Sequence, residues 1–406
     1  MNKLPRENFD PEQALLTGAR RVFGEFGGVN QSIHPSTTFT TMDPEIMSSM
    51  FNGSLSQKGC HLYGRHFHPN SLQLGAQVAA MENTQAAYPV ASGMAAISTV
   101  LNQVLEPGSH IIASQDVYGG TYAYLNNVLR AKEIEVSFVD PCDPESIAAE
   151  VAENTKAIFV ELMSNPLLKI CDLEAISQIA GDDIQLIVDN TFAPLTFTPA
   201  NLGADIVIYS GTKFLNGMSD FVSGIICCSS DFLTDLMDLQ SGQLMLGGPV
   251  LDPKSCFQLQ LYLQTLPTRI REHSYRSLII AGELASKKRF KIIHPGLESS
   301  EDFTPAHRQC NKSFAMGGMM AIDLETYENA RRFIMALQDS GWAFNAVSLG
   351  YFHSLVSISG SSTSSEIDME TQATANLSPG LVRVSVGFMG NIDRQIEGFE
   401  QALAAI

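Results

Sequence analysis

Between about residues 85 and 230 the sequence alternates short apolar runs with amphipathic stretches, and this pattern restricts the possible folds most. Such alternation is typical of β/α units around a mostly parallel sheet. It predicts strands at 110–114, 135–139, 156–162, 185–189, 205–209 and 223–228. Many of these runs are apolar on both faces, as buried parallel strands are. Because parallel strands end at the same edge of a sheet, we expect a common cleft there.

The clearest predicted helix follows Ser92. Its apolar residues fall at i, i+3, i+4, i+7 and i+8, and these are Ile97, Val100, Leu101, Val104 and Leu105. Ser92 is a natural N-cap. The free N–H groups and the helix dipole make this end an anion site, and Gly93 permits close approach of a phosphate. The alternative is an ordinary capped helix without a ligand.

The chain length indicates two or three lobes, since 406 residues are too many for one small core. Residues 1–62 have few periodic apolar positions and predict an irregular arm of the kind that packs on a neighbour. Composition changes near residue 250, so we predict a large domain at 63–255 and a smaller C-terminal domain at 256–406. The Ser-rich run at 357–365 is interpreted as a loop.

The charge balance argues against nucleic acid as a partner. Lys and Arg number 25 against 43 Asp and Glu, which gives a net charge of −18, and no basic stripe is present. The N-terminus is polar, and no segment approaches the roughly 18 apolar residues of a membrane span. We therefore predict a cytoplasmic protein without a membrane partner.

The seven cysteines are odd in number and scattered, and they form no CxxC pair. They are interpreted as reduced core residues. The densest group of metal-binding residue types comprises Cys60, His61, His66 and His68. Its spacing fits no closed zinc site, so we predict no metal.

The string Ser210-Gly211-Thr212-Lys213 directly follows the predicted strand at 205–209. Ser210 and Thr212 lie two residues apart and project to the same side of an extended segment, so both hydroxyls could bind one phosphate. Lys213 then stands at the edge of the cleft, where its amine could reach an aldehyde. The alternative is a surface lysine that happens to follow a strand.

Two further residues suit a flat, charged cofactor. Asp189 ends a strongly apolar strand, and a buried carboxylate needs a cationic partner, for which a protonated pyridine nitrogen would serve. Tyr118 precedes Gly119-Gly120, and its ring could stack on the cofactor. Separately, Asp189 could cap a turn and Tyr118 could be a packing residue. Together with the phosphate-binding residues and Lys213, they indicate pyridoxal 5′-phosphate (PLP).

At these residues the sequence resembles the Cys/Met-metabolism family of fold-type I PLP-dependent enzymes. The resemblance runs through FGEFGGVNQSIHPSTTFT, YGRHFHP, ASGMAAI, DVYGGTY, VDNTFAP, LGADIVIYSGTKF, VSLGYFHSL and GLVRVSVG in the order of the family. The strings GQLMLGGP, REHSYRS and SLVSISGSSTSSEID are similar to the plant-type methionine γ-lyases within it. The resemblance implies an α/β fold with a mostly parallel sheet in the large domain and a smaller α+β C-terminal domain.

The resemblance also implies a role for individual residues. Lys213 looks like the Schiff-base lysine, Asp189 like the partner of the pyridine nitrogen, and Tyr118 like the residue that stacks over the ring and protonates the leaving group. Arg383 resembles the arginine that binds the substrate α-carboxylate, assisted by the backbone around Ser348. The phosphate would be bound by Gly93, Met94, Ser210 and Thr212, and by Tyr63 and Arg65 of a neighbouring subunit. This sharing implies a homo-oligomer, a tetramer built from dimers.

The implied reaction is γ-elimination of L-methionine to methanethiol, 2-oxobutanoate and ammonia. A cystathionine γ- or β-lyase, an O-acylhomoserine sulfhydrylase or a cystathionine γ-synthase remain alternatives, because they use the same residues on other substrates. A further alternative is a structural or regulatory protein that keeps this fold but binds no PLP. The chain departs from the common family pattern at Phe214, Met218 and residues 261–266, and it has Gly120 where many bacterial methionine γ-lyases have Cys.

Overall fold

The computed structural model describes residues 4–18, 23–41, 43–51, 61–359 and 378–406. Its larger sheet has seven strands in the order β1-β7-β6-β5-β4-β2-β3. They are β1 (Ala86–Val90), β2 (His110–Ser114), β3 (Glu135–Val139), β4 (Thr155–Glu161), β5 (Gln185–Asp189), β6 (Ile206–Tyr209) and β7 (Gly224–Cys228). The five strands from β2 to β6 run parallel to one another, whereas β7 is antiparallel to β6 and to β1.

The predicted mostly parallel sheet is therefore confirmed. All six expected strands are present, three with the expected bounds and three shifted by one residue at one or both ends. Strand β1, which lies at the edge of the sheet and contains Pro89, was not predicted. Proline is tolerated in an edge strand, but it weakens the sequence signal for a strand.

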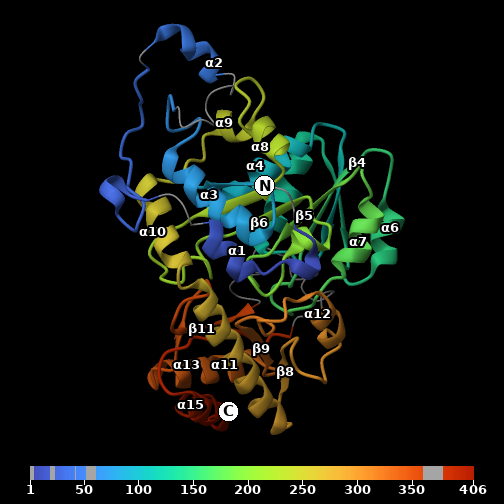
Figure 1. The fold of residues 1–406 in the computed structure, drawn as a ribbon. Helices are drawn as coiled ribbons and strands as arrows, with labels where there is room; N and C mark the ends of the chain where they lie inside the picture. The colour runs from blue at the N-terminus through green and yellow to red at the C-terminus, as the bar shows by residue number, and fades with distance from the viewer. Residues whose placement is uncertain (1–3, 19–22, 42, 52–60, 360–377) are drawn as a thin grey trace.

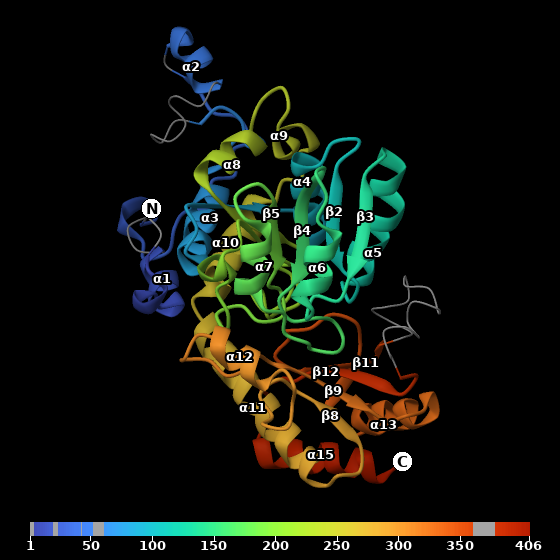
Figure 2. The ribbon, with the colours of Figure 1, turned by 90° about the vertical axis from the view of Figure 1, so that its right-hand side faces the viewer.

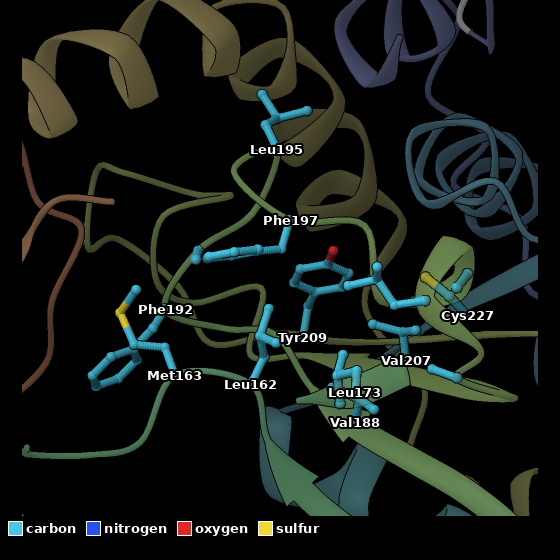
Figure 3. Close-up of a cluster of buried hydrophobic side chains, with 14 of the residues drawn as sticks. Leu162, Met163, Leu173, Val188, Phe192, Leu195, Phe197, Val207, Tyr209 and Cys227 are labelled. Atoms are coloured by element: carbon cyan, nitrogen blue, oxygen red, sulfur yellow. The ribbon is translucent and has the colours of Figure 1, made fainter. Parts of the chain in front are cut away.

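Alternate residues of the central strands enter two different hydrophobic clusters, one on each face of the sheet. In β4, Ile158 and Val160 belong to the first cluster and Ala157 and Phe159 to the second. This follows from the two-residue period of a strand, and it explains why these strands are apolar throughout. Figure 3 shows part of the first cluster, including Phe197 and Tyr209.

Helices cover both faces of this sheet (Figures 1 and 2). The helices α3 (Pro69–Glu82), α7 (Leu173–Ala180) and α10 (Pro253–Leu263) contribute buried residues to the first cluster. The helices α4 (Gly93–Val104) and α8 (Ser230–Leu236) contribute to the second. The remaining helices of this part are α5 (Gly119–Ala123), a π-helical turn (Tyr124–Leu129), α6 (Pro144–Glu150), α9 (Gln243–Gly247) and two short 3-10 helices (Arg130–Lys132 and Pro199–Leu202). The predicted helix after Ser92 is thus α4, and the Ser92 hydroxyl caps it.

A smaller five-stranded sheet lies below the first in Figure 2, in the order β10-β11-β12-β9-β8. Its strands are β8 (Lys291–Ile293), β9 (Met319–Asp323), β10 (Ala343–Asn345), β11 (Ser354–Ile358) and β12 (Leu381–Ser385). The helices of this region are α11 (Leu266–Ser286), α12 (Phe303–Gln309), α13 (Tyr327–Asp339) and α15 (Ile392–Ala404). The region forms a separate α+β layer with its own hydrophobic cluster, as the fold class implied. The domain boundaries at 62 and 255 stay a prediction.

Three expectations need correction. The N-terminal arm is not wholly irregular, because α1 (Pro11–Gly18) packs on α3 through the fully buried Leu15, while α2 (Met47–Phe51) stands away from the body (Figure 1). The Ser-rich run begins inside β11, and its residues from 360 onward lie outside the described residues. Not every cysteine is a core residue, since Cys142 is exposed and Cys310 half-buried; Cys60 lies outside the described residues. No helix in the described ranges is long and apolar enough to cross a membrane.

Candidate active site

A pocket of about 390 Å³ lies at the carboxyl ends of the parallel strands and is also lined by residues from the region of the smaller sheet. Nine of the predicted site residues line it: Gly93, Met94, Tyr118, Asp189, Ser210, Thr212, Lys213, Ser348 and Arg383. They come from the N-terminus of α4, the end of β5, the turns after β2 and β6, the segment before β11, and β12. The topology therefore brings together residues that are up to 290 positions apart in the chain, counting from 93 to 383.

Tyr63 and Arg65 are the two predicted site residues that do not line this pocket. Tyr63 is 45% exposed, and the Arg65 guanidinium lies over its ring at 5.6 Å. Arg65 also donates a hydrogen bond of 2.9 Å to the carbonyl of Met245. That Tyr63 and Arg65 bind the phosphate in the site of a neighbouring subunit stays a prediction.

Lys213 lies in the turn after β6, with its amino group inside the pocket. Its Nζ donates a hydrogen bond of 2.8 Å to the hydroxyl of Ser348. Burial, with a further contribution from the positive charge of Arg383, lowers the pKa of Lys213 to about 8. A larger fraction of this amine is therefore neutral near neutral pH than in an ordinary lysine, which suits it to attack a carbonyl or to accept a proton.

One wall of the pocket is shaped for a phosphate. The N-terminus of α4 points into it, and the backbone N–H groups of Gly93 and Met94 have no hydrogen-bond partner among the described residues. A Cβ on Gly93 would lie 2.8 Å from the Cβ of Ser210, so only glycine allows this close approach of the two segments. The Thr212 hydroxyl, by contrast, already donates to the carbonyl of Ser223 at 3.1 Å and accepts from its N–H at 3.0 Å.

Two carboxyl groups on neighbouring strands also line the pocket. Asp189 ends β5 and accepts a hydrogen bond of 2.9 Å from the N–H of Thr191. Glu161 ends β4 and is paired with Asp189 in the register of the two strands. Burial raises the pKa of both groups, and the neighbouring charge of Asp189 raises that of Glu161 further. A cation bound here would offset the cost of this buried negative charge.

Arg383 lies in the middle of β12 and is only 3% exposed. Its guanidinium donates to the side-chain oxygen of Asn165 at 3.3 Å and to the carbonyl of Ser348 at 3.0 Å. No carboxylate of the described residues forms an ion pair with it, and burial lowers its pKa to about 10. A buried cation that faces a pocket without a counter-charge is a site for an anionic ligand.

Sequence reasoning missed several residues that line the pocket. Glu161, like Asp189, is a carboxylate at the end of an apolar strand. The same sequence pattern could therefore have identified it. Asn165 and Thr191 lie in turns after β4 and β5, and nothing in their local sequence singles them out. Besides Met94, the apolar lining comprises Ile97, Met163, Phe192, Val222, Val347 and Leu349.

Of the alternative metal site, His61, His66 and His68 belong to the described residues, whereas Cys60 lies outside them. No group of three or more His, Cys, Asp or Glu in the described ranges is placed to hold a metal ion. His68 is the N-cap of α3, and its Nδ1 accepts a hydrogen bond from the N–H of Asn70 at 3.2 Å.

The pocket thus contains an anion site at a helix N-terminus, two neighbouring carboxyl groups, and a lysine whose pKa is lowered. PLP carries a phosphate, a ring nitrogen that binds a proton, and an aldehyde, so the residues present fit this cofactor. Together with the seven-stranded, mostly parallel sheet, they define a fold-type I PLP-dependent enzyme.

Residues 13–404 match the family described as Cys/Met metabolism PLP-dependent enzyme, and the chain belongs to this family. It is 42% identical to a methionine gamma-lyase of Arabidopsis thaliana over 96% of this chain and 89% of that one. It is 33% identical to an L-methionine gamma-lyase of Pseudomonas putida over 93% of each chain.

Among solved structures, the cystathionine gamma-lyase of Lactobacillus plantarum complexed with L-serine superposes with a TM-score of 0.88 at 30% identity, covering 98% and 99% of the two chains. A putative O-acetylhomoserine (thiol)-lyase of Campylobacter jejuni, with a pyridoxyl-lysine phosphate, gives a TM-score of 0.87 at 27% identity, covering 98% of this chain and 100% of that one.

Proposed function

We propose that this PLP-dependent enzyme converts L-methionine and water into methanethiol, 2-oxobutanoate and ammonia by γ-elimination. The observation that carries the proposal is the 42% identity to the Arabidopsis thaliana methionine gamma-lyase over nearly the whole chain. The pocket supports it, because its apolar lining suits a methylthio group and its buried arginine suits an α-carboxylate.

In this proposal Lys213 holds the cofactor covalently, Asp189 pairs with the ring nitrogen, and Gly93, Met94, Ser210 and Thr212 surround the phosphate. When bound, PLP withdraws electrons from the substrate and so stabilises negative charge at Cα. Arg383 and Asn165 bind the α-carboxylate and orient the Cα–H bond toward Lys213. Once the substrate amine has taken its place on the cofactor, the Lys213 amine, whose pKa is lowered, would accept that proton and then one from Cβ, so that the electron pair left at Cβ can expel the sulfur.

Tyr118 would donate a proton to the departing sulfur. Its side chain lines the pocket and is 41% exposed in the single chain, so its ring is accessible to a ligand. We also propose that Tyr63 and Arg65 of a second copy complete the phosphate site, in a tetramer built from dimers that share active sites. A cytoplasmic location accords with this metabolic role.

A cystathionine lyase is the second candidate, since a cystathionine gamma-lyase of Bacillus subtilis is 35% identical over 85% of this chain. Cystathionine carries a second carboxylate and a second amine at its far end, which need polar partners. Of the described residues that line the pocket, Lys213 and Arg383 are the only cations, and the proposal assigns both to other groups. This favours methionine.

The test is a substrate panel on the purified, PLP-loaded protein, with the Lys213→Ala variant as the inactive control. We expect 2-oxobutanoate and methanethiol to form from L-methionine in equal amounts. A kcat/KM for L-cystathionine more than tenfold above that for L-methionine would move the assignment to a cystathionine lyase. A product that forms only from O-acetylhomoserine plus a thiol would move it to a sulfhydrylase.

A further inference from the structure

Glu161 contacts the one residue proposed to protonate the leaving group. Its carboxyl oxygen Oε1 accepts a hydrogen bond of 2.6 Å from the backbone N–H of Tyr118. Glu161 ends β4, whereas Tyr118 lies in the turn between β2 and α5, and β2 and β4 are neighbours in the sheet. Glu161 is only 6% exposed, so water does not compete strongly for this contact.

Tyr118 directly precedes α5, whose first two residues are the glycines Gly119 and Gly120. Its side chain makes no capping bond to α5. A second contact holds the turn from the same side, because Asp116 forms an ion pair of 3.0 Å with Lys169 in the segment after β4. The end of β4 and the segment that follows it therefore fix the turn at two points.

The surroundings of Glu161 indicate which property of its side chain matters. The titratable groups that face it are Asp189 on β5 and Asp116 in the turn after β2, and both are acidic. Burial and the negative charge of Asp189 raise the pKa of Glu161, so the site disfavours a second negative charge beside Asp189. A neutral carboxyl group still offers its carbonyl oxygen as an acceptor.

We propose that Glu161 is a positioning residue, which holds Tyr118 at the pocket through an acceptor oxygen and not through a negative charge. This rests on the proposed function, because it takes Tyr118 as the proton donor. Gln keeps the acceptor oxygen without the charge, and Met keeps the volume without the acceptor. Glu161→Gln and Glu161→Met therefore separate the two properties.

The first measurement is amide hydrogen exchange at Tyr118 in the protein without PLP. We expect Glu161→Met to speed exchange of this amide by about tenfold or more and Glu161→Gln to change it by less than about threefold. The control Lys156→Ala lies on the exposed side of β4 and should leave exchange unchanged. Unchanged protection in Glu161→Met would overturn the positioning role.

The second measurement is steady-state kinetics of the PLP-loaded proteins. We expect Glu161→Met to lower kcat by about 10- to 100-fold with little change in KM, and Glu161→Gln to keep kcat within about threefold of the unsubstituted protein. An equal loss of kcat in both variants would show that the charge is required. If the unsubstituted protein does not act on L-methionine, the proposed function fails, while the exchange experiment still tests the contact.

Discussion

Ser348 forms hydrogen bonds both with Lys213, in the turn after β6, and with Arg383 in β12. Its hydroxyl accepts a hydrogen bond from Lys213, and its carbonyl accepts one from Arg383. The residue has a φ of 82°, which a non-glycine residue rarely adopts. This conformation places both oxygens where the two cations can reach them, and it is local strain of the kind found at functional sites.

The lowered pKa of Lys213 predicts a pH-dependent cost to the stability of the protein without PLP. Below about pH 8 the amine is protonated in both the folded and the unfolded state, and the cost of its burial is fully present. The cost disappears as the pH rises toward the unfolded pKa of about 10.4. We expect Lys213→Met to be more stable than the unsubstituted protein by on the order of 2 kcal/mol at about pH 7.

Urea unfolding of both PLP-free proteins at about pH 7 and about pH 10 measures this difference. The advantage of Lys213→Met should shrink as the pH rises, because only the unsubstituted protein gains stability from loss of the Lys213 proton. An advantage that grows with pH would contradict the assigned direction of the pKa shift.

We predict that replacing Arg383 even by lysine weakens substrate binding. Its planar guanidinium can bind a carboxylate with two parallel hydrogen bonds, which the single ammonium of lysine cannot do. We expect Arg383→Lys to raise KM for L-methionine by about 10- to 100-fold, a cost of about 1.5–3 kcal/mol. Asn165→Ala should have a smaller effect of the same kind, and an unchanged KM in both variants would place the carboxylate elsewhere.

Chain order explains why much of this site could be predicted from the sequence. Asp189 and Lys213 each follow a strongly apolar strand, and parallel strands deliver the residues after them to one edge of the sheet. The N-cap pattern before α4 likewise placed Gly93 at this edge. These inferences needed only local periodicity and the rule that relates parallel strands.

Contacts between the two sheets could not be predicted in this way. Local patterns around Ser348 and Arg383 do not show which part of the large sheet they face, so only the family resemblance indicated their roles. Leu15 illustrates the same point, since α1 is short and becomes recognisable as packed structure only against α3. Such positions depend on tertiary packing, which a one-dimensional pattern does not contain.

We predict that a side chain at position 120 displaces the Tyr118 ring. A Cβ at position 120 would lie 2.6 Å from Cε1 of Tyr118 and 3.3 Å from the sulfur of Met94, so the ring must move. We expect Gly120→Ala to lower kcat for L-methionine by about tenfold, because a displaced proton donor acts less efficiently. The matched control is Gly282→Ala in α11, where a Cβ meets no atom within 4 Å and kcat should not change. Normal kcat in Gly120→Ala would show that the ring position is not critical.

We predict that the turn after Lys213 depends on the buried side chain of Arg269. This residue is 5% exposed, and its guanidinium donates to the carbonyls of Phe214 at 2.6 Å, Leu215 at 2.9 Å and Tyr262 at 3.1 Å. Gly217 has a φ of 74°, and a Cβ there would lie 2.4 Å from the guanidinium. The backbone that carries the lysine is therefore folded around this side chain.

We expect Arg269→Met to destabilise the protein by about 2–4 kcal/mol, because it leaves these buried carbonyls without a donor. It should also lower kcat, because the turn that positions Lys213 loosens. Arg271→Met on the same helix is the matched control: Arg271 is exposed and pairs with Glu12 at the surface, so its loss should cost less than about 1 kcal/mol. Urea unfolding and kcat for the two variants decide the matter, and equal effects would mean that the buried carbonyls find other donors.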